Sequence, residues 1–228
     1  MLEIKNLTAG YDPENPVLKN IALDFPESSV TGILGSNGAG KTTFFNAVSR
    51  LRAPYSGEIL LNKIPLDSSN WSFLETSPFF YPYITGSEYL QLCTLSNPDF
   101  EFEKWNEIFG LPLHQLTETY STGMKKKLSL LGVIGQNRKV LLLDEPFNGL
   151  DLEAVEVVLL VLEKLKNQGK IILLSSHVLS TLTDVCDRIY WLKEGQIFRA
   201  FERQDFPELE NILKKTIRHQ TAGKLDEL

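Results

Sequence analysis

One stretch of nine residues carries the most specific chemical pattern in the sequence. It satisfies the pattern G-x-x-x-x-G-K-[ST] and reads Gly35-Ser36-Asn37-Gly38-Ala39-Gly40-Lys41-Thr42-Thr43. Glycines let the backbone curl so that successive N–H groups point at phosphate oxygens, and a helix that begins there adds its positive dipole end. Lys41 should reach the β- and γ-phosphates of a nucleotide, and the Thr42 hydroxyl should ligate Mg²⁺. Thr43 should bond either the α-phosphate region or the backbone.

A pair of carboxylates follows an aliphatic run further along the chain. Val140–Leu143 leads directly into Asp144 and Glu145, and ligands of open α/β sheets bind at the carboxyl ends of strands. We predict that Asp144 holds Mg²⁺ through water and that Glu145 orients and deprotonates an attacking water molecule. An acidic pair at a strand end is common when it stands alone, but downstream of a phosphate loop the catalytic interpretation is favoured.

Three further positions carry weaker signals. Ser121–Lys125 precedes a helical run, where a hydroxyl and a glycine form either an anion-binding nest or a plain N-cap, and the residues alone favour the cap. His177 follows the aliphatic run Ile171–Leu174 on the same sheet edge as the carboxylates, so we predict a polar contact with the γ-phosphate. Tyr11 lies between two early strands and either stacks on adenine or is an ordinary surface tyrosine.

Short apolar runs that alternate with helical periodicity must position these residues. Such alternation favours a parallel sheet covered by helices on both faces. The first 24 residues alternate apolar and polar positions, as expected of short strands. The other predicted elements are a strand at Val30–Leu34, a helix at Lys41–Leu51, a helical lobe at about 83–136, a strand at Val140–Leu143, a helix at Leu152–Asn167, a strand at Ile171–Leu174, a hairpin at Ile189–Phe201 and a helix at Glu208–His219.

The composition narrows the class of protein. The 228 residues include 29 acidic and 23 basic side chains, for a net charge of −6. Because nucleic-acid binding needs a basic field, we expect no nucleic-acid partner, and the run Lys125–Lys127 is predicted to be a solvated helix face. Two distant cysteines, Cys93 and Cys186, favour a reduced intracellular compartment. No apolar run approaches the roughly 20 residues of a membrane helix.

Taken together, the order of these motifs resembles the ABC-type ATPases from about residue 2 to 202. Tyr11 matches the adenine-stacking aromatic position of that family. The segments that look like its Walker A, signature, Walker B, D-loop and H-loop motifs are Gly35–Thr43, Ser121–Lys125, Val140–Pro146, Asn148–Asp151 and His177.

The resemblance implies more than the motifs themselves predict. It implies an α/β fold: a P-loop NTPase core with a mostly parallel sheet, an N-terminal antiparallel β subdomain and a helical subdomain inserted at about 83–136. This ATPase domain would span 1–205, and the helical tail 206–228 has no assigned role. ATP and Mg²⁺ would lie between the Walker A motif of one chain and the signature motif of another, in a head-to-tail dimer with itself or with a similar ATPase subunit.

Across that interface, Ser121 and Gly123 would contact the γ-phosphate and Asp151 would communicate with the partner's site. A separately encoded membrane permease would be the other partner, holding the subunit at the cytoplasmic, inner face of the cell membrane. The loop that leads into the helical lobe would face this permease.

Two departures from the family pattern stand out. The family usually has a glutamine at the junction before the helical lobe, and here either Thr76 or the adjacent Glu75 takes that place. The signature carries Thr122 in place of its first glycine, in a form similar to stand-alone ATPase subunits of bacterial ABC-2-type exporters, which suggests export.

Two other functions compete with that of a transport motor. The ABC proteins of translation or DNA repair fit poorly, since they usually join two ATPase domains or carry a long coiled coil. A nucleotide-operated switch with little turnover is kept open by the two departures, although Glu145 and His177 argue against it.

Overall fold

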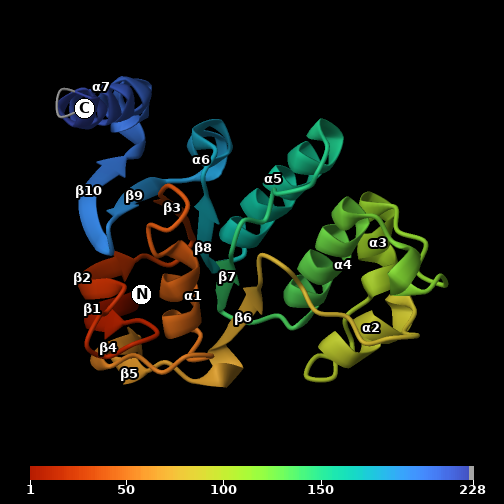
Figure 1. The fold of residues 1–228 in the computed structure, drawn as a ribbon. Helices are drawn as coiled ribbons and strands as arrows, with labels where there is room; N and C mark the ends of the chain where they lie inside the picture. The colour runs from red at the N-terminus through yellow and green to blue at the C-terminus, as the bar shows by residue number, and fades with distance from the viewer. Residues whose placement is uncertain (226–228) are drawn as a thin grey trace.

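A mainly parallel sheet lies at the centre of the computed structural model, which describes residues 1–225 (Figure 1). Within these residues the sheet has six strands in the order β10-β9-β3-β8-β7-β6, all parallel to their neighbours except β10. Their bounds are β3 Ser29–Leu34, β6 Trp71–Leu74, β7 Val140–Leu143, β8 Ile171–Ser176, β9 Arg188–Lys193 and β10 Gln196–Glu202. Every residue of β3, β7 and β8 is buried, as expected when helices or a second sheet cover both faces.

A second, antiparallel sheet packs beside the first and supplies the N-terminal part of the chain. Its order is β2-β1-β4-β5, with bounds β1 Leu2–Ala9, β2 Leu18–Phe25, β4 Ser56–Leu61 and β5 Ile64–Pro65. Helix α1 (Lys41–Val48) lies between the two sheets and buries Phe44 and Phe45 in the core that they share. The helix is shorter than predicted because Arg50 adopts a left-handed conformation with φ 56°, which ends the helical hydrogen-bond pattern before Leu51.

Three helices form a lobe at the far end of the molecule from the antiparallel sheet (Figure 1). They are α2 Gly86–Cys93, α3 Phe102–Phe109 and α4 Thr122–Gly135, with a 3-10 turn at Thr117–Thr119. Helix α2 begins with a capping box between Thr85 and Glu88. It approaches α4 closely because Gly132 has no side chain: a Cβ there would lie 2.9 Å from the Cys93 sulfur. All three helices fall within the predicted range 83–136.

The remaining helices cover the other face of the parallel sheet and its far edge. Helix α5 (Leu152–Asn167) has the predicted bounds, whereas α6 (Leu179–Val185) was not predicted. Helix α7 (Phe206–Leu225) follows the β9–β10 hairpin and is longer than expected; residues 226–228 of the predicted tail 206–228 lie outside the described part of the chain. Short 3-10 turns occupy Ser68–Asn70 and Arg203–Asp205.

The length and polarity of the helices decide whether any of them could cross a membrane. Among residues 1–225, no helix is both long enough and apolar enough to cross a bilayer. The α/β architecture, with a mostly parallel sheet and an N-terminal antiparallel sheet, is the one that the sequence predicted.

Candidate active site

A cavity of about 500 Å³ opens at the carboxyl ends of the parallel strands. Its volume lies within the roughly 300–1,000 Å³ of small-molecule sites. Segments from distant parts of the sequence meet there, which the sheet order explains because β3, β8 and β7 are adjacent. The lining residues are Tyr11, Val17, Ser36, Asn37, Gly38, Gly40, Lys41, Thr42, Thr43, Thr76, Glu145, Asn148 and His177.

The glycine loop owes its shape to positions that other residues would strain. Gly38 and Gly40 have φ values of 80° and 106°, in the region that favours glycine. A Cβ on Gly35 would lie 2.8 Å from the Leu192 carbonyl oxygen. Within the loop, the Ala39 N–H donates to the Ser36 carbonyl at 3.1 Å, which closes the turn before α1 begins. The backbone therefore curls at the helix N-terminus, as a phosphate-binding nest requires.

Three hydroxyl groups hold the buried carboxylate of Asp144. Thr42 and Thr76 each donate to its Oδ2 at 2.7 Å, and Ser175 donates to its Oδ1 at 2.5 Å. These oxygen donors fit Mg²⁺, which binds one or two carboxylates together with hydroxyl, phosphate and water oxygens. Of the two residues considered for the junction before the helical lobe, Thr76 reaches Asp144, whereas Glu75 is exposed. Ser175 was not among the predicted site residues.

Glu145 stands between the lysine of the loop and His177. Its Oε1 lies 3.3 Å from the Lys41 ammonium, and its Oε2 lies 3.0 Å from His177 Nδ1. The Glu145 backbone has φ 51° immediately before Pro146, a strained conformation for a residue with a side chain. The Glu145 N–H donates to the Ser175 hydroxyl at 2.9 Å, so one serine orients both carboxylate residues.

Tyr11 lies at the outer rim of the cavity. The residue is 62% exposed, and the Arg52 guanidinium lies over its ring at 4.6 Å from the centroid. A cation on one face leaves the opposite face of the ring for stacking with a planar group. Its position in the cavity lining supports the predicted stacking, which stays a prediction.

Comparison with known proteins identifies the family. Residues 18–148, which include both the glycine loop and the carboxylate pair, match the ABC transporter family. The chain belongs to this family. It is the ATP-binding subunit of an ABC transporter, as the resemblance of its motifs predicted.

Curated relatives of this ABC subunit cover most of its length. The bacitracin transport ATP-binding protein BcrA of Enterococcus faecalis is 35% identical over 86% of this chain and 68% of its own. The cobalt import ATP-binding protein CbiO of Salmonella typhimurium is 32% identical over 86% of this chain and 79% of its own. The chain spans 63% of the length of the ABC transporter ATP-binding protein YdbJ of Bacillus subtilis, at 32% identity over 79% of this chain.

Solved structures of ABC subunits share the fold. The ATP-binding subunit of an ABC transporter matches with a TM-score of 0.83 and 27% identity, covering 90% of this chain and 91% of that one. CbiO1 of Clostridium perfringens, described as part of the ABC transporter complex cbiONQ, matches with a TM-score of 0.74 and 26% identity, covering 100% and 98% of the two chains.

Six predicted residues do not line the cavity: Gly35, Ala39 and Asp144 are buried next to residues that do, and three others lie elsewhere in the ABC subunit. Ser121 caps α4 by accepting from the Met124 N–H at 3.2 Å, and Asp151 caps α5 by accepting from the Ala154 N–H at 2.8 Å. Gly123 packs against the loop before α5, where a Cβ on it would lie 2.9 Å from the Gly149 carbonyl oxygen. Within a single chain these last three residues have structural roles, and their predicted contact with a nucleotide across a dimer interface stays a prediction.

The prediction of a solvated lysine run is wrong for its central residue. Lys126 is only 3% exposed, and its ammonium donates to the carbonyls of Thr76 at 2.7 Å and Glu75 at 3.2 Å. The Lys127 ammonium donates to the Phe109 carbonyl at 2.7 Å, inside the helical lobe. Helix α4 packs its second turn against the end of β6, so this part of the run faces protein and not solvent.

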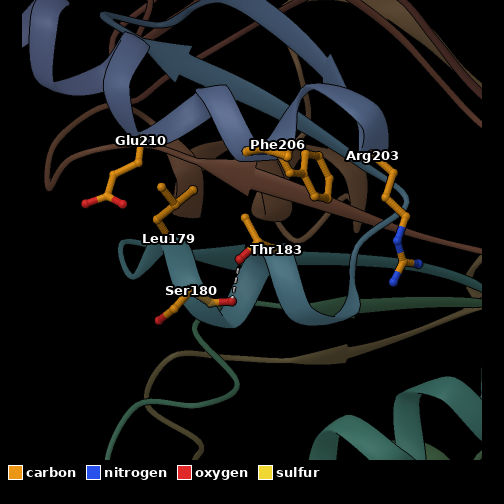
Figure 2. Close-up of a pocket in the computed structure, with 7 residues that line it drawn as sticks. Leu179, Ser180, Thr183, Arg203, Phe206 and Glu210 are labelled. Atoms are coloured by element: carbon orange, nitrogen blue, oxygen red, sulfur yellow. Dashed lines mark hydrogen bonds between the residues drawn. The ribbon is translucent and has the colours of Figure 1, made fainter.

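A second cavity, of about 720 Å³, lies between α6 and the start of α7 (Figure 2). Figure 2 shows Leu179 and Thr183 on the side of α6 that faces Phe206 and Glu210 of α7, with Arg203 at one side. None of the predicted site residues lines it, and no glycine loop or paired carboxylates face it. The smaller cavity is therefore the candidate active site, because the predicted phosphate-binding loop and the predicted base line it, and Thr42 and Thr76 in its lining bond Asp144, the predicted Mg²⁺ ligand.

Proposed function

We propose that this ABC subunit hydrolyses ATP in the cavity and thereby powers a separately encoded membrane permease. The observation that carries the proposal is the placement of Glu145 between Lys41 and His177, beside the glycine loop. A carboxylate in this position can accept a proton from a water molecule that faces the terminal phosphate.

The residues of the cavity divide the reaction between binding and proton transfer. The loop N–H groups and Lys41 hold the β- and γ-phosphates. The γ-phosphate thereby replaces Glu145 as the ion-pair partner of the Lys41 ammonium. Thr42 and Asp144 hold Mg²⁺, which supplies charge neutralisation on the phosphate oxygens when bound. Water attacks the γ-phosphorus, the bond from that phosphorus to the β–γ bridging oxygen breaks, and the water proton passes to Glu145. His177 keeps the Glu145 carboxylate oriented and contacts the γ-phosphate.

The proposed assembly is a head-to-tail dimer with a second copy or a similar ATPase subunit. Ser121 and Gly123 stand at the start of α4, outside the cavity of their own chain. In the dimer they face the γ-phosphate that the partner holds, and the N-terminus of α4 adds its positive dipole end. Asp151 lies at the same surface, next to the Gly149 loop.

The proposed permease places the subunit at the cytoplasmic face of a membrane. Its relative CbiO1 is described as part of a transporter complex, which supports a separate membrane partner. The form of the signature supports export, although the related proteins include one named for cobalt import and one for bacitracin transport. The direction of ATP-dependent substrate movement in inside-out membrane vesicles that carry the subunit and its permease tests this part of the proposal.

The experiment that tests the core of the proposal replaces the base. Purified wild type, Glu145→Gln and the control Glu156→Gln, an exposed carboxylate on α5, are mixed with ATP and Mg²⁺. Phosphate release is measured together with molar mass by light scattering. Wild type and control should hydrolyse ATP, and Glu145→Gln should lose about 10²- to 10⁴-fold in rate while it accumulates as an ATP-bound dimer.

Two results would contradict parts of the proposal. Turnover by Glu145→Gln at the wild-type rate removes Glu145 as the base. ATP binding by wild type without turnover, even with the permease present, favours the nucleotide-operated switch.

A further inference from the structure

A buried lysine links the helical lobe to the candidate active site. Lys126 comes from the second turn of α4 and is 3% exposed. Its ammonium donates to two backbone carbonyls, those of Glu75 and Thr76, at 3.2 and 2.7 Å. Within residues 1–225 no carboxylate oxygen lies within 4.0 Å of the Lys126 ammonium, so this cation forms no direct ion pair there.

Burying a cation in this way is costly unless other charges compensate. Burial lowers the pKa of the Lys126 ammonium, whereas the negative charges of Asp144 and Glu145 act in the opposite direction. The two carboxylates that define the proposed hydrolytic site therefore also favour the charged form of Lys126. A neutral residue of similar length would fill the same space but would lack this electrostatic interaction with Asp144 and Glu145.

The carbonyl that Lys126 binds belongs to the residue that touches Asp144. Thr76 accepts from Lys126 through its backbone oxygen and donates to Asp144 Oδ2 through its hydroxyl at 2.7 Å. The same Asp144 oxygen accepts from Thr42 at 2.7 Å. A continuous line of hydrogen bonds thus runs from α4, through the segment after β6, to the residues that would hold Mg²⁺.

We propose that Lys126 is a positioning residue: it fixes the Glu75–Thr76 backbone so that the Thr76 hydroxyl stays on Asp144, and so couples the placement of the helical lobe to the Mg²⁺ site. The proposal rests on the proposed ATPase function. Since α4 also begins with Ser121 and Gly123, a shift of this helix would move the signature residues and Thr76 together.

The test compares Lys126→Met, Lys126→Arg and Lys127→Met in the full chain. Lys127 is the matched control, because its ammonium also donates to a carbonyl, but to that of Phe109 within the lobe. For Lys126→Met we expect kcat to fall, and the Mg²⁺ concentration for half-maximal rate to rise, by about 10- to 100-fold, as for residues that orient metal ligands. The KM for ATP should change less than about 3-fold, Lys126→Arg should restore most of the rate, and Lys127→Met should behave as wild type.

A readout independent of turnover is the affinity for a fluorescent ATP analogue with and without Mg²⁺. At the Mg²⁺ concentration that half-saturates wild type, Lys126→Met should lack most of the gain in affinity that Mg²⁺ gives wild type, yet it should bind the analogue normally without metal and at saturating Mg²⁺, where the KM values are compared. Combining it with Thr76→Val, which keeps the carbonyl but removes the hydroxyl, should add little further loss, because both changes act through one segment.

The outcomes separate this inference from the proposed function. Equal effects of Lys126→Met and Lys127→Met on rate, or full additivity with Thr76→Val, would overturn the positioning role while ATP hydrolysis stands. Loss of thermal stability with an unchanged Mg²⁺ response would also overturn it, leaving a purely structural lysine. Absence of hydrolysis by wild type would instead defeat the proposed function.

Discussion

The Lys41 ammonium lies 3.3 Å from Glu145 Oε1 and 2.9 Å from the Gly35 carbonyl oxygen, and both charged side chains are nearly buried. The proposed phosphate-binding cation and the proposed base therefore neutralise each other. A γ-phosphate that binds Lys41 replaces Glu145 as its partner, so nucleotide binding itself would release the base for proton transfer.

Removing the cation should weaken nucleotide binding directly. Lys41→Ala deletes the charge aimed at the phosphates and leaves the partly buried Glu145 carboxylate with His177 as its partner. We expect the affinity for ATP to fall at least tenfold, or about 1.4 kcal/mol, as measured by calorimetric titration. Lys63→Ala, at an exposed position in the β4–β5 turn, is the control. Unchanged affinity for Lys41→Ala would contradict the phosphate-binding role of the loop.

Ser175 should matter to both carboxylate residues. Ser175→Ala leaves a buried Asp144 oxygen and the Glu145 N–H without their present partner. Leaving such groups unsatisfied costs about 1–3 kcal/mol, so we expect the denaturant midpoint and the rate of ATP hydrolysis to fall. The Ser176 hydroxyl forms hydrogen bonds with the Val178 backbone and the Thr181 hydroxyl. Ser176→Ala should therefore lower stability without a comparable loss of rate. A rate loss shared equally by the two variants would argue against this role.

Tyr11 should contribute to affinity through its ring. Tyr11→Ala removes the π-face at the cavity rim, and base–aromatic stacking is worth about 1–3 kcal/mol. We therefore expect the KM for ATP to rise by roughly 5- to 150-fold with kcat nearly unchanged. Tyr11→Phe keeps the ring and should behave as wild type; a large effect of Tyr11→Phe would show that the hydroxyl and not the ring is used.

Glu27 gives the fold an acid-sensitive contact between its two sheets. Hydrogen bonds from Lys139 and then from the Met1 amine lower the pKa of Glu27 from 4.5 to about 2. Because the folded-state pKa is the lower one, the contribution to stability is complete above about pH 4.5 and is lost as the pH falls toward 2.

Denaturant midpoints measured across that range test the contact. Glu27→Gln should be less stable than wild type at pH 7, and the difference should vanish near pH 2. The exposed Glu14→Gln is the control. A constant difference between Glu27→Gln and wild type at all pH values would show that the contact does not depend on ionisation.

The sequence predicted the parts of the site that local chemistry specifies. Gly38 and Gly40 mark a turn that few residues tolerate, and the short aliphatic run Val140–Leu143 is typical of a buried strand, which delivers Asp144 at its end. The bounds of α5 were predicted because a helical stretch from Leu152 to Asn167 is followed by Gly169, a typical helix stop.

The remaining features depend on contacts between distant segments. The side chains of Glu75 and Thr76 both have oxygen atoms that could serve at the junction before the helical lobe. Only the direction of the chain after β6 decides that Thr76 turns toward Asp144 while Glu75 faces solvent. Lys126 lies within a run of three lysines, and nothing local distinguishes the one that packs against the end of β6. Helix α6 is too short for its apolar spacing to stand out.

The contact between the signature and the loop before α5 has a consequence for kinetics. The methyl group of Thr122 lies 3.1 Å from the position that a Cβ on Gly149 would occupy. Gly149 lies four residues after Glu145 in the sequence. In the proposed dimer, Glu145 serves the nucleotide of its own chain and Thr122 borders that of the partner. Each nucleotide would then change the response to the other, so turnover should rise with ATP concentration along a sigmoid rather than a simple hyperbola.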